Sequence, residues 1–200
     1  MNKKFIKAIA LALIIVISST VLVSCGKDAW KVENMSADAY GDLPIVKINT
    51  QDGKNPVDKE NYVNCSFEIT NCTNPEHNFK VSMKESFDYE EDDGGVGVRL
   101  RGNTTMAYDK KPYRVKFEKS KSLFGLQKAK SWVLLADYLD QSNMRNYVAL
   151  TLGNDVFDNL DFTAHPNHVI LEFNGEYKGV YLLCEQMDEK KGRANVEVDE

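Results

Sequence analysis

Apolar and polar side chains alternate over several short segments of this chain, a pattern that predicts β-strands with one buried face. In one segment, Val63, Cys65, Phe67 and Ile69 take every second position. Gly, Pro and Asn residues separate the segments and predict turns. Strands are expected at residues 46–49, 62–70, 79–83, 97–101, 113–119, 132–136, 168–173 and 177–187.

One segment, residues 143–152, has the apolar spacing of an amphipathic helix. Ser142 is a candidate N-cap and Gly153 a candidate end of this helix. The inner face of the helix would carry Met144, Tyr147, Val148 and Thr151.

Asn174-Gly175 stands between the last two predicted strands and is a strong signal for a tight hairpin. Many strands with one clear helix predict an α+β fold. We expect a β-rich N-terminal module followed by an antiparallel sheet with one main helix.

The first 25 residues have the pattern of an export signal. Lys3, Lys4 and Lys7 precede an apolar run at 8–17, and Leu22-Val23-Ser24-Cys25 resembles the bacterial lipobox. We therefore expect cleavage before Cys25, lipid on that cysteine, and a protein held on the outer face of the cell membrane.

Two alternatives for this N-terminus stay open. One is a membrane-spanning anchor, although residues 8–23 are shorter than the roughly 20 apolar residues that a span needs. The second is an ordinary signal peptide in which the cysteine stands by chance.

The formal charge of −5 would become −8 once the three leader lysines are removed. Such an acidic balance argues against a nucleic-acid partner, because nucleic-acid binders are usually basic. The acidic run at 88–93 is more typical of a solvated loop than of a metal site, and no zinc-type Cys/His spacing occurs. We predict no metal ligand in this chain.

Three cysteines remain after the leader: Cys65, Cys72 and Cys184. An exported protein permits disulfides, and Cys65 and Cys72 are close enough to pair across a turn. Cys184 falls in an apolar strand and is expected to be buried.

Two predicted strands carry cations on one face and apolar groups on the other. If these strands pair, Arg99, Arg101, Arg114 and Lys116 crowd together and repel unless an anion lies among them. Arginine and lysine both suit phosphate. The alternative is a solvated cationic face that pairs with the acidic run.

Two carboxylates, Glu172 and Glu185, lie inside otherwise apolar strands. Glu185 alternates with Tyr181 and Leu183, so it should share their face. Kinases use a Lys–Glu pair to orient a phosphate-binding lysine, and Glu185 is our candidate for that carboxylate. A salt bridge at a strand end is the plainer alternative.

A long, ordered set of motifs resembles the CotH-type spore-coat kinase family. The motifs begin with Val98-Arg99-Leu100-Arg101-Gly102-Asn103-Thr104-Thr105, Lys110-Lys111-Pro112-Tyr113-Arg114-Val115-Lys116-Phe117 and Ser122-Leu123-Phe124-Gly125. They continue with the segments at 132–140, 144–146 and 174–186. The residues before Asp93 match only in general character.

The resemblance implies an atypical, secretory-type protein kinase, remote from ordinary kinases, whose sheet is similar to a kinase N-lobe. Members bind ATP with a divalent metal such as Mg²⁺ and phosphorylate serines on extracytoplasmic or spore-coat proteins. The nucleotide-binding candidates in this chain are Arg99, Arg101, Arg114, Lys116 and Glu185.

One departure from the family pattern concerns its catalytic and metal-binding aspartates. The family carries them C-terminal to the region present here, and its metal-binding aspartate lies in a Trp-Asp-x-Asp-like motif. Neither tryptophan of this chain, Trp30 or Trp132, precedes an aspartate pair. We therefore expect no catalytic residue in this chain and place the catalytic aspartates C-terminal to Glu200. The chain would then be the N-terminal part of a longer kinase, inactive alone. A non-catalytic envelope or spore-coat scaffold is the alternative.

The expected organisation has four segments. They are a leader at 1–24, a flexible tether at 25–42, a β-rich lead module at 43–93, and the N-terminal part of a kinase-like domain at 94–200.

Replacing the predicted lipidation site, Cys25→Ser, should release the protein from membranes or leave it unprocessed, because the acceptor sulfur is gone. Mass spectrometry of the mature N-terminus tests this. A mature chain that begins elsewhere, or that carries no lipid on Cys25, would contradict it.

Overall fold

The computed structural model describes residues 41–88, 90, 93–157, 160 and 162–188, so the predicted leader and Cys25 lie outside the described residues. The described part contains eight strands and one α-helix. In chain order they are β1 (Ile45–Thr50), β2 (Val63–Thr70), β3 (Phe79–Val81), β4 (Val96–Leu100), β5 (Tyr113–Lys121), β6 (Ala129–Leu135), α2 (Arg145–Asp155), β7 (Asn167–Phe173) and β8 (Glu176–Glu185).

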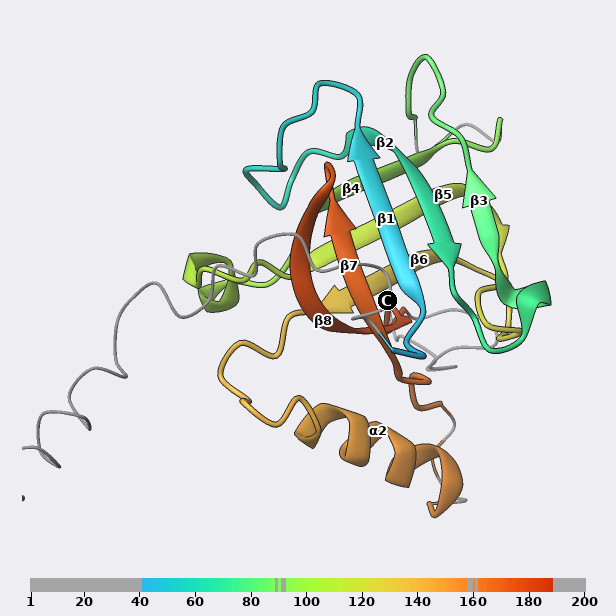
Figure 1. Cartoon of the computed structure of the whole chain (residues 1–200), viewed down its shortest axis with the longest axis vertical. Coiled ribbons are helices and arrows are strands. Elements are labelled where there is room, and N and C mark those ends of the chain that lie inside the picture. Colours follow the sequence, from blue (N-terminus) through green and yellow to red (C-terminus); the bar gives the residue numbers. More distant parts are fainter. Residues whose placement is uncertain (1–40, 89, 91–92, 158–159, 161, 189–200) are drawn as a thin grey trace, which may run out of the picture. The chain divides into compact units, whose positions relative to one another are not determined.

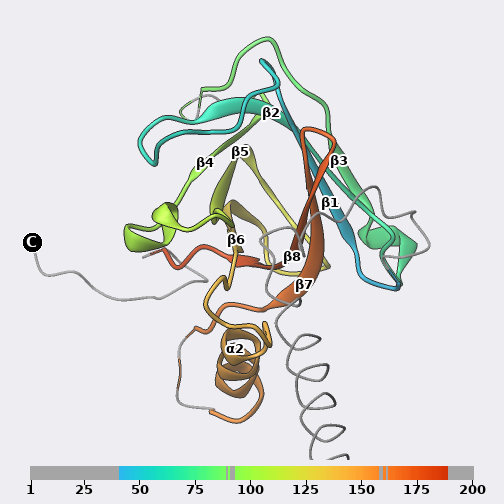
Figure 2. The ribbon, with the colours of Figure 1, turned by 60° about the vertical axis from the view of Figure 1, so that its left-hand side comes forward.

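Seven of the strands close into a barrel (Figures 1 and 2). Their order is β1-β7-β8-β6-β5-β4-β2, and β2 pairs with β1 to complete the ring. Every pairing is antiparallel except that of β1 with β7. The short strand β3 adds to the outer edge of β2.

This barrel contradicts the predicted α+β fold with a kinase N-lobe-like sheet and one main helix. Strands from both predicted segments, 43–93 and 94–200, pair in one sheet. Alternation along a strand shows that one of its faces is buried, but it does not show which strands are neighbours. The parallel pairing of β1 with β7 joins residues more than 100 positions apart and leaves no local signal.

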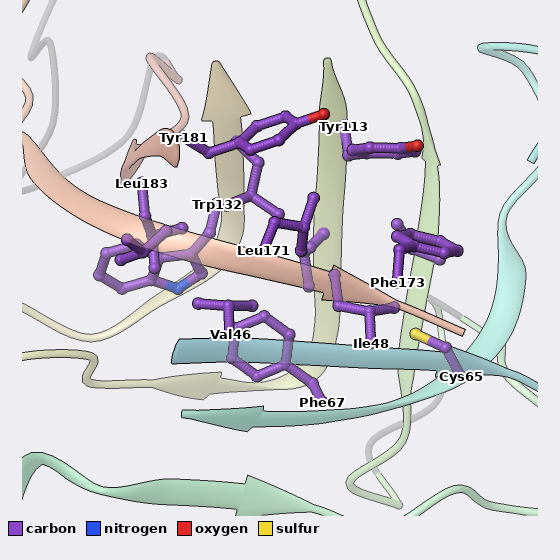
Figure 3. Close-up of a cluster of buried hydrophobic side chains, with 14 of the residues drawn as sticks. Val46, Ile48, Cys65, Phe67, Tyr113, Trp132, Leu171, Phe173, Tyr181 and Leu183 are labelled. Atoms are coloured by element: carbon purple, nitrogen blue, oxygen red, sulfur yellow. The ribbon is translucent and has the colours of Figure 1, made fainter. Parts of the chain in front are cut away.

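The interior of the barrel is a continuous hydrophobic core to which nearly every strand contributes (Figure 3). Ile48, Phe67, Trp132 and Leu171 are fully buried. Tyr113 stacks on Phe173 with ring centroids 4.8 Å apart. Each large side chain removed from water contributes about 1.5–3 kcal/mol, so the inward positions dominate the stability of the fold.

The predicted hairpin between β7 and β8 is confirmed, and it also holds β1. Asn174 and Gly175 both have positive φ, 51° and 77°, as a two-residue turn between twisted strands requires. The Asn174 side-chain oxygen accepts hydrogen bonds from the backbone N–H of Thr50 at 2.8 Å and from its hydroxyl at 3.1 Å. The turn residue thereby fixes the end of β1 against the hairpin.

The helix α2 was predicted in the right place, and half of its predicted inner face is confirmed, because Tyr147 stacks on His168 and Thr151 is partly buried. Leu150 packs against Val133 and Cys184 on the outside of the barrel, while Met144 and Val148 are 44% and 45% exposed. The capping prediction also fails, because the N-cap is Met144 and Gly153 lies inside the helix. Gly153 is needed there because a Cβ would meet the Thr163 side chain at 2.7 Å.

Glu118 lies on the outer face of β5, yet it is only 1% exposed. Its carboxylate accepts hydrogen bonds from the backbone N–H of Gly95 at 2.5 Å and of Asp88 at 3.1 Å. The approach is so close that a Cβ on Gly95 would come within 2.7 Å of the carboxylate. Glu118 thus fastens both sides of the acidic connection between β3 and β4.

The variant Glu118→Gln should lower the free energy of unfolding by about 2–3 kcal/mol. It replaces one carboxylate oxygen with an amide nitrogen, which cannot accept a hydrogen bond from the backbone N–H. Urea unfolding measures the change. Glu60→Gln, at an exposed glutamate, is the matched control and should be nearly neutral. Equal stability of the two variants would show that the hydrogen bonds to the Glu118 carboxylate contribute nothing to the free energy of unfolding.

Candidate functional site

Three of the predicted cations meet on the outer face of the barrel. Arg99 of β4 lies directly opposite Arg114 of β5, while their neighbours Val98 and Val115 point into the core. With Arg101 they line a pocket of about 190 Å³, here called the arginine pocket. Its walls are Lys59, Arg99, Leu100, Arg101, Gly102, Arg114 and Gln186.

Arg99 is largely committed to holding the chain before β2. Its guanidinium lies 4.6 Å from the centre of the Tyr62 ring. Nη1 donates to the carbonyl oxygens of Lys59 and Glu60. The buried Nε lacks an acceptor among the described residues. Arg99 therefore shapes one wall of the pocket and has little capacity left for a ligand.

Arg114 is held from two sides. Nη2 donates to the Ser131 hydroxyl at 3.1 Å and lies 3.5 Å from Oδ1 of Asp188. Its buried Nε has no acceptor among the residues that the structure describes. Arg114 therefore keeps a fixed position and an unused donor.

Arg101 is the least satisfied of the three. Burial, together with the nearby charge of Arg114, lowers the pKa of its guanidinium, and the thiol of Cys184 opposes this shift. Within the described part of the chain, no hydrogen bond or ion pair of the Arg101 side chain is found. A partly buried cation without a counter-charge is a strong site for an anion.

The structure does not bring Lys116 and Glu185 to this pocket. Lys116 lies opposite Gly97, outside the arginine pocket, with Nζ 6.0 Å from the centre of the Tyr62 ring. Glu185 pairs in register with Trp132, so it faces the barrel interior, where it is 1% exposed. The two side chains therefore lie on opposite faces of the sheet.

Glu185 is bound by the segment before β7. Its carboxylate accepts from the backbone N–H of His165 at 2.7 Å and lies 3.1 Å from Nδ1 of the same residue. Glu172, the other candidate carboxylate, pairs with Lys47 at 3.4 Å. The nucleotide-binding role proposed for Glu185 and Lys116 stays a prediction.

The expected place of the catalytic aspartates, C-terminal to Glu200, also stays a prediction. Glu200 and the residues from 189 onward lie outside the described residues. The geometry of the described part therefore concerns binding groups alone, and no catalytic role is assigned to any of them.

A second, larger pocket of about 390 Å³ adjoins the first, and Arg101 lines both. We call it the tyrosine pocket, after Tyr108 and Tyr138, whose rings stack with centroids 5.0 Å apart. Lys110 and Asp137 also line it. The sequence patterns did not reveal this pocket, although a polar Asp137-Tyr138 step directly after an apolar strand was a usable signal.

The charged groups of the tyrosine pocket are held firmly. Lys110 donates to the carbonyl oxygen of Val180 at 2.5 Å and lies over the Tyr181 ring. Burial lowers the pKa of Lys110, and the Asp137 carboxylate opposes this. Asp137 has a φ of 45° and accepts from Asn146 at 2.6 Å. A left-handed non-glycine residue at a pocket wall is strained, as functional positions often are.

The described residues hold neither a metal centre nor a membrane span. Among them, no three His, Cys, Asp or Glu side chains gather as a metal site would require. No helix within the described ranges has both the length and the apolar character needed to cross a bilayer.

The three described cysteines are free thiols. Burial raises the pKa of Cys65, which lies in the core, and raises that of Cys184 to about 12, with a further contribution from the Glu185 charge. Cys72 is less deeply buried, and burial raises its pKa as well. The predicted burial of Cys184 is confirmed at 3% exposure.

Residues 98–200 match the family model for the CotH kinase protein. The match covers slightly more than half of the chain and includes Arg99, Arg101, Arg114 and the whole tyrosine pocket. It confirms the resemblance that the sequence motifs indicated. A comparison with curated proteins finds no match.

Alkylation of the native protein at pH 8 should label Cys72 at least about tenfold faster than Cys65 and Cys184, because only the thiolate reacts and burial suppresses it. Peptide mass spectrometry after timed iodoacetamide treatment measures the rates. Labelling in urea should make the three rates similar. Fast native labelling of Cys184 would contradict its placement beneath the helix α2.

Proposed function

The chain belongs to the CotH kinase protein family, and on this premise we propose that it supplies the nucleotide-binding part of an ATP-dependent protein serine kinase. The observation that carries the proposal is Arg101, a partly buried cation that has no counter-charge among the described residues and lies beside Arg114, in a chain that is acidic overall. The family match indicates which anion to expect, namely phosphate.

The donors that the arginine pocket offers suit the phosphates of a nucleotide. Within the described residues, the Arg101 guanidinium has no hydrogen bond or ion pair, and Arg114 has a buried Nε without an acceptor. Planar guanidinium groups bind phosphate oxygens in pairs. The pocket therefore fits the phosphate chain of ATP.

The nucleoside would lie in the tyrosine pocket, because Arg101 lines both pockets and joins them. At about 390 Å³ this pocket falls within the usual size range for small ligands. The exposed ring of Tyr138 offers an apolar surface there. Lys110, fixed by the carbonyl oxygen of Val180, adds positive charge near the same ligand.

In this arrangement the chain binds and orients phosphate rather than transferring it. Arg101 and Arg114 would hold phosphate oxygens and offset their negative charge. A divalent metal, if bound, would supply positive charge that offsets the charge developing on the phosphates. No residue in the described ranges is assigned to that metal, because no suitable group of ligands gathers there. The catalytic aspartates are likewise assigned to no residue of this chain.

The cellular setting is part of the proposal and rests on the sequence. The lipobox-like Leu22-Val23-Ser24-Cys25 supports export and a lipid anchor on the outer face of the membrane. The protein substrate would then be a serine of an envelope or spore-coat protein. The lipid on Cys25 is the expected contact of this chain with the membrane, and no nucleic acid is expected as a partner.

A second candidate function is a non-catalytic envelope or coat scaffold. The observation that favours it is the exposed apolar row Val148, Leu152 and Val156 along α2, with exposures of 45%, 43% and 58%. Such a row suits contact with another protein surface. Nucleotide binding separates the two candidates, because a scaffold has no need of it.

The variants Arg101→Ala and Arg114→Ala should each weaken ATP binding at least about tenfold, because each removes charge-assisted hydrogen bonds to phosphate. Isothermal titration of the complete gene product with ATP, with and without Mg²⁺, measures the change. Circular dichroism checks the fold.

Lys119→Ala is the matched control, since Lys119 is an exposed cation of the same strand outside both pockets. It should leave the affinity unchanged. Equal ATP affinity in wild type and in both folded arginine variants would end the phosphate-site assignment, whereas absence of ATP binding by the wild type would favour the scaffold.

A further inference from the structure

The arginine pocket already has an internal carboxylate at its edge. Oδ1 of Asp188 lies 3.5 Å from Nη2 of Arg114. Both side chains are about three-quarters buried, with exposures of 23% for Arg114 and 26% for Asp188. This ion pair is thus less screened by water than the other Lys and Arg pairs at the surface.

Asp188 belongs to a short segment that leaves β8 along the pocket. The backbone N–H of Gln186 donates to the carbonyl oxygen of Ser131 at 3.2 Å, and the Gln186 side chain lines the arginine pocket. The segment therefore stays beside β6 until Gln186, and Asp188 reaches back to Arg114 two residues later. Its position depends on the ion pair more than on the strand.

Arg114, in contrast, does not depend on Asp188. Its Nη2 also donates to the Ser131 hydroxyl at 3.1 Å, and strand β5 pairs on both sides, with β4 and with β6. The guanidinium can keep its place when the carboxylate leaves. This asymmetry argues that Asp188 is a replaceable occupant rather than a support.

The charge around the pocket points the same way. Four cations line it: Lys59, Arg99, Arg101 and Arg114. Among the described residues, the carboxylates of Asp188 and of Asp58, which interacts with Arg99, carry less charge than these four cations. A multiply charged anion would offset far more of this charge than Asp188 does.

We propose that Asp188 is an internal competitor for the anion of the arginine pocket. Identifying that anion as phosphate rests on the proposed function. With the pocket empty, the carboxylate binds Arg114 and lowers the apparent affinity for phosphate. Binding of phosphate displaces Asp188 from Arg114. The same contact therefore couples occupancy of the pocket to the position of Asp188.

The test measures the affinity of wild type and Asp188→Asn for two probes, inorganic pyrophosphate and ATP, by isothermal titration. The asparagine keeps the shape of the side chain and removes its charge. Affinity for pyrophosphate should rise about three- to tenfold, as expected for the loss of a partly screened competing charge. In an Arg114→Ala background, Asp188→Asn should have no effect, because the competing contact is already absent.

Asp93→Asn is the matched control. Asp93 is ion-paired with Lys84 at 3.8 Å, and it does not line the arginine pocket. It removes the same formal charge, so it corrects for a general electrostatic effect. If it raises the affinity as much as Asp188→Asn does, competition at Arg114 is excluded.

The remaining outcomes separate this inference from the proposed function. Weaker pyrophosphate binding by Asp188→Asn would mean that Asp188 positions Arg114, and unchanged binding would mean no competition; either overturns the inference. Tighter pyrophosphate binding without any ATP binding would support the competitor and overturn the nucleotide proposal. Absence of binding to both probes by every variant overturns both.

Discussion

Closure of the sheet is the constraint on which the rest of this structure depends. Because β1 pairs with both β2 and β7, the barrel has a sealed interior and one continuous outer face. Most inward-facing residues of the strands are then apolar, as in Val98 and Val115, and the residues between them face outward. The gathering of Arg99 and Arg114 on the outside is a direct result of this alternation and of the β4–β5 register.

The individual elements could be predicted from the sequence, but their closure could not. Alternation located the strands, and Asn174-Gly175 located the hairpin, because both signals act between near neighbours. The fold class was wrong because the decisive contacts join distant segments. The inner face of α2 was predicted only in part for a related reason. Tyr147, which stacks on His168, and Leu150 anchor the helix, while Val148 of the predicted face stays exposed.

The candidate site shows the same division. Alternation predicted which cations share a face, and the structure places Arg99, Arg101 and Arg114 in one pocket. The alternation could not show which arginines already have hydrogen-bond partners. Arg99 donates to the carbonyl oxygens of Lys59 and Glu60, whereas Arg101 has no partner in the described part. Those differences arise from loops that carry no periodic signal. Glu118 is a further example, because its carboxylate is bound by the backbone N–H groups of Asp88 and Gly95, which lie outside any periodic segment.

The parallel pairing of β1 with β7 has a consequence for the order of events during synthesis. Ile45 of β1 pairs with Ile170, so the pairing of β1 with β7 has to wait until more than 120 further residues have been made. A topology with such high contact order folds slowly, because the entropic cost of closing a long loop comes before the contacts that reward it. The ribosome would therefore release most of the chain before the ring can close. For a chain that carries the proposed export signal, this delay would keep the polypeptide extended until it has crossed the translocation channel.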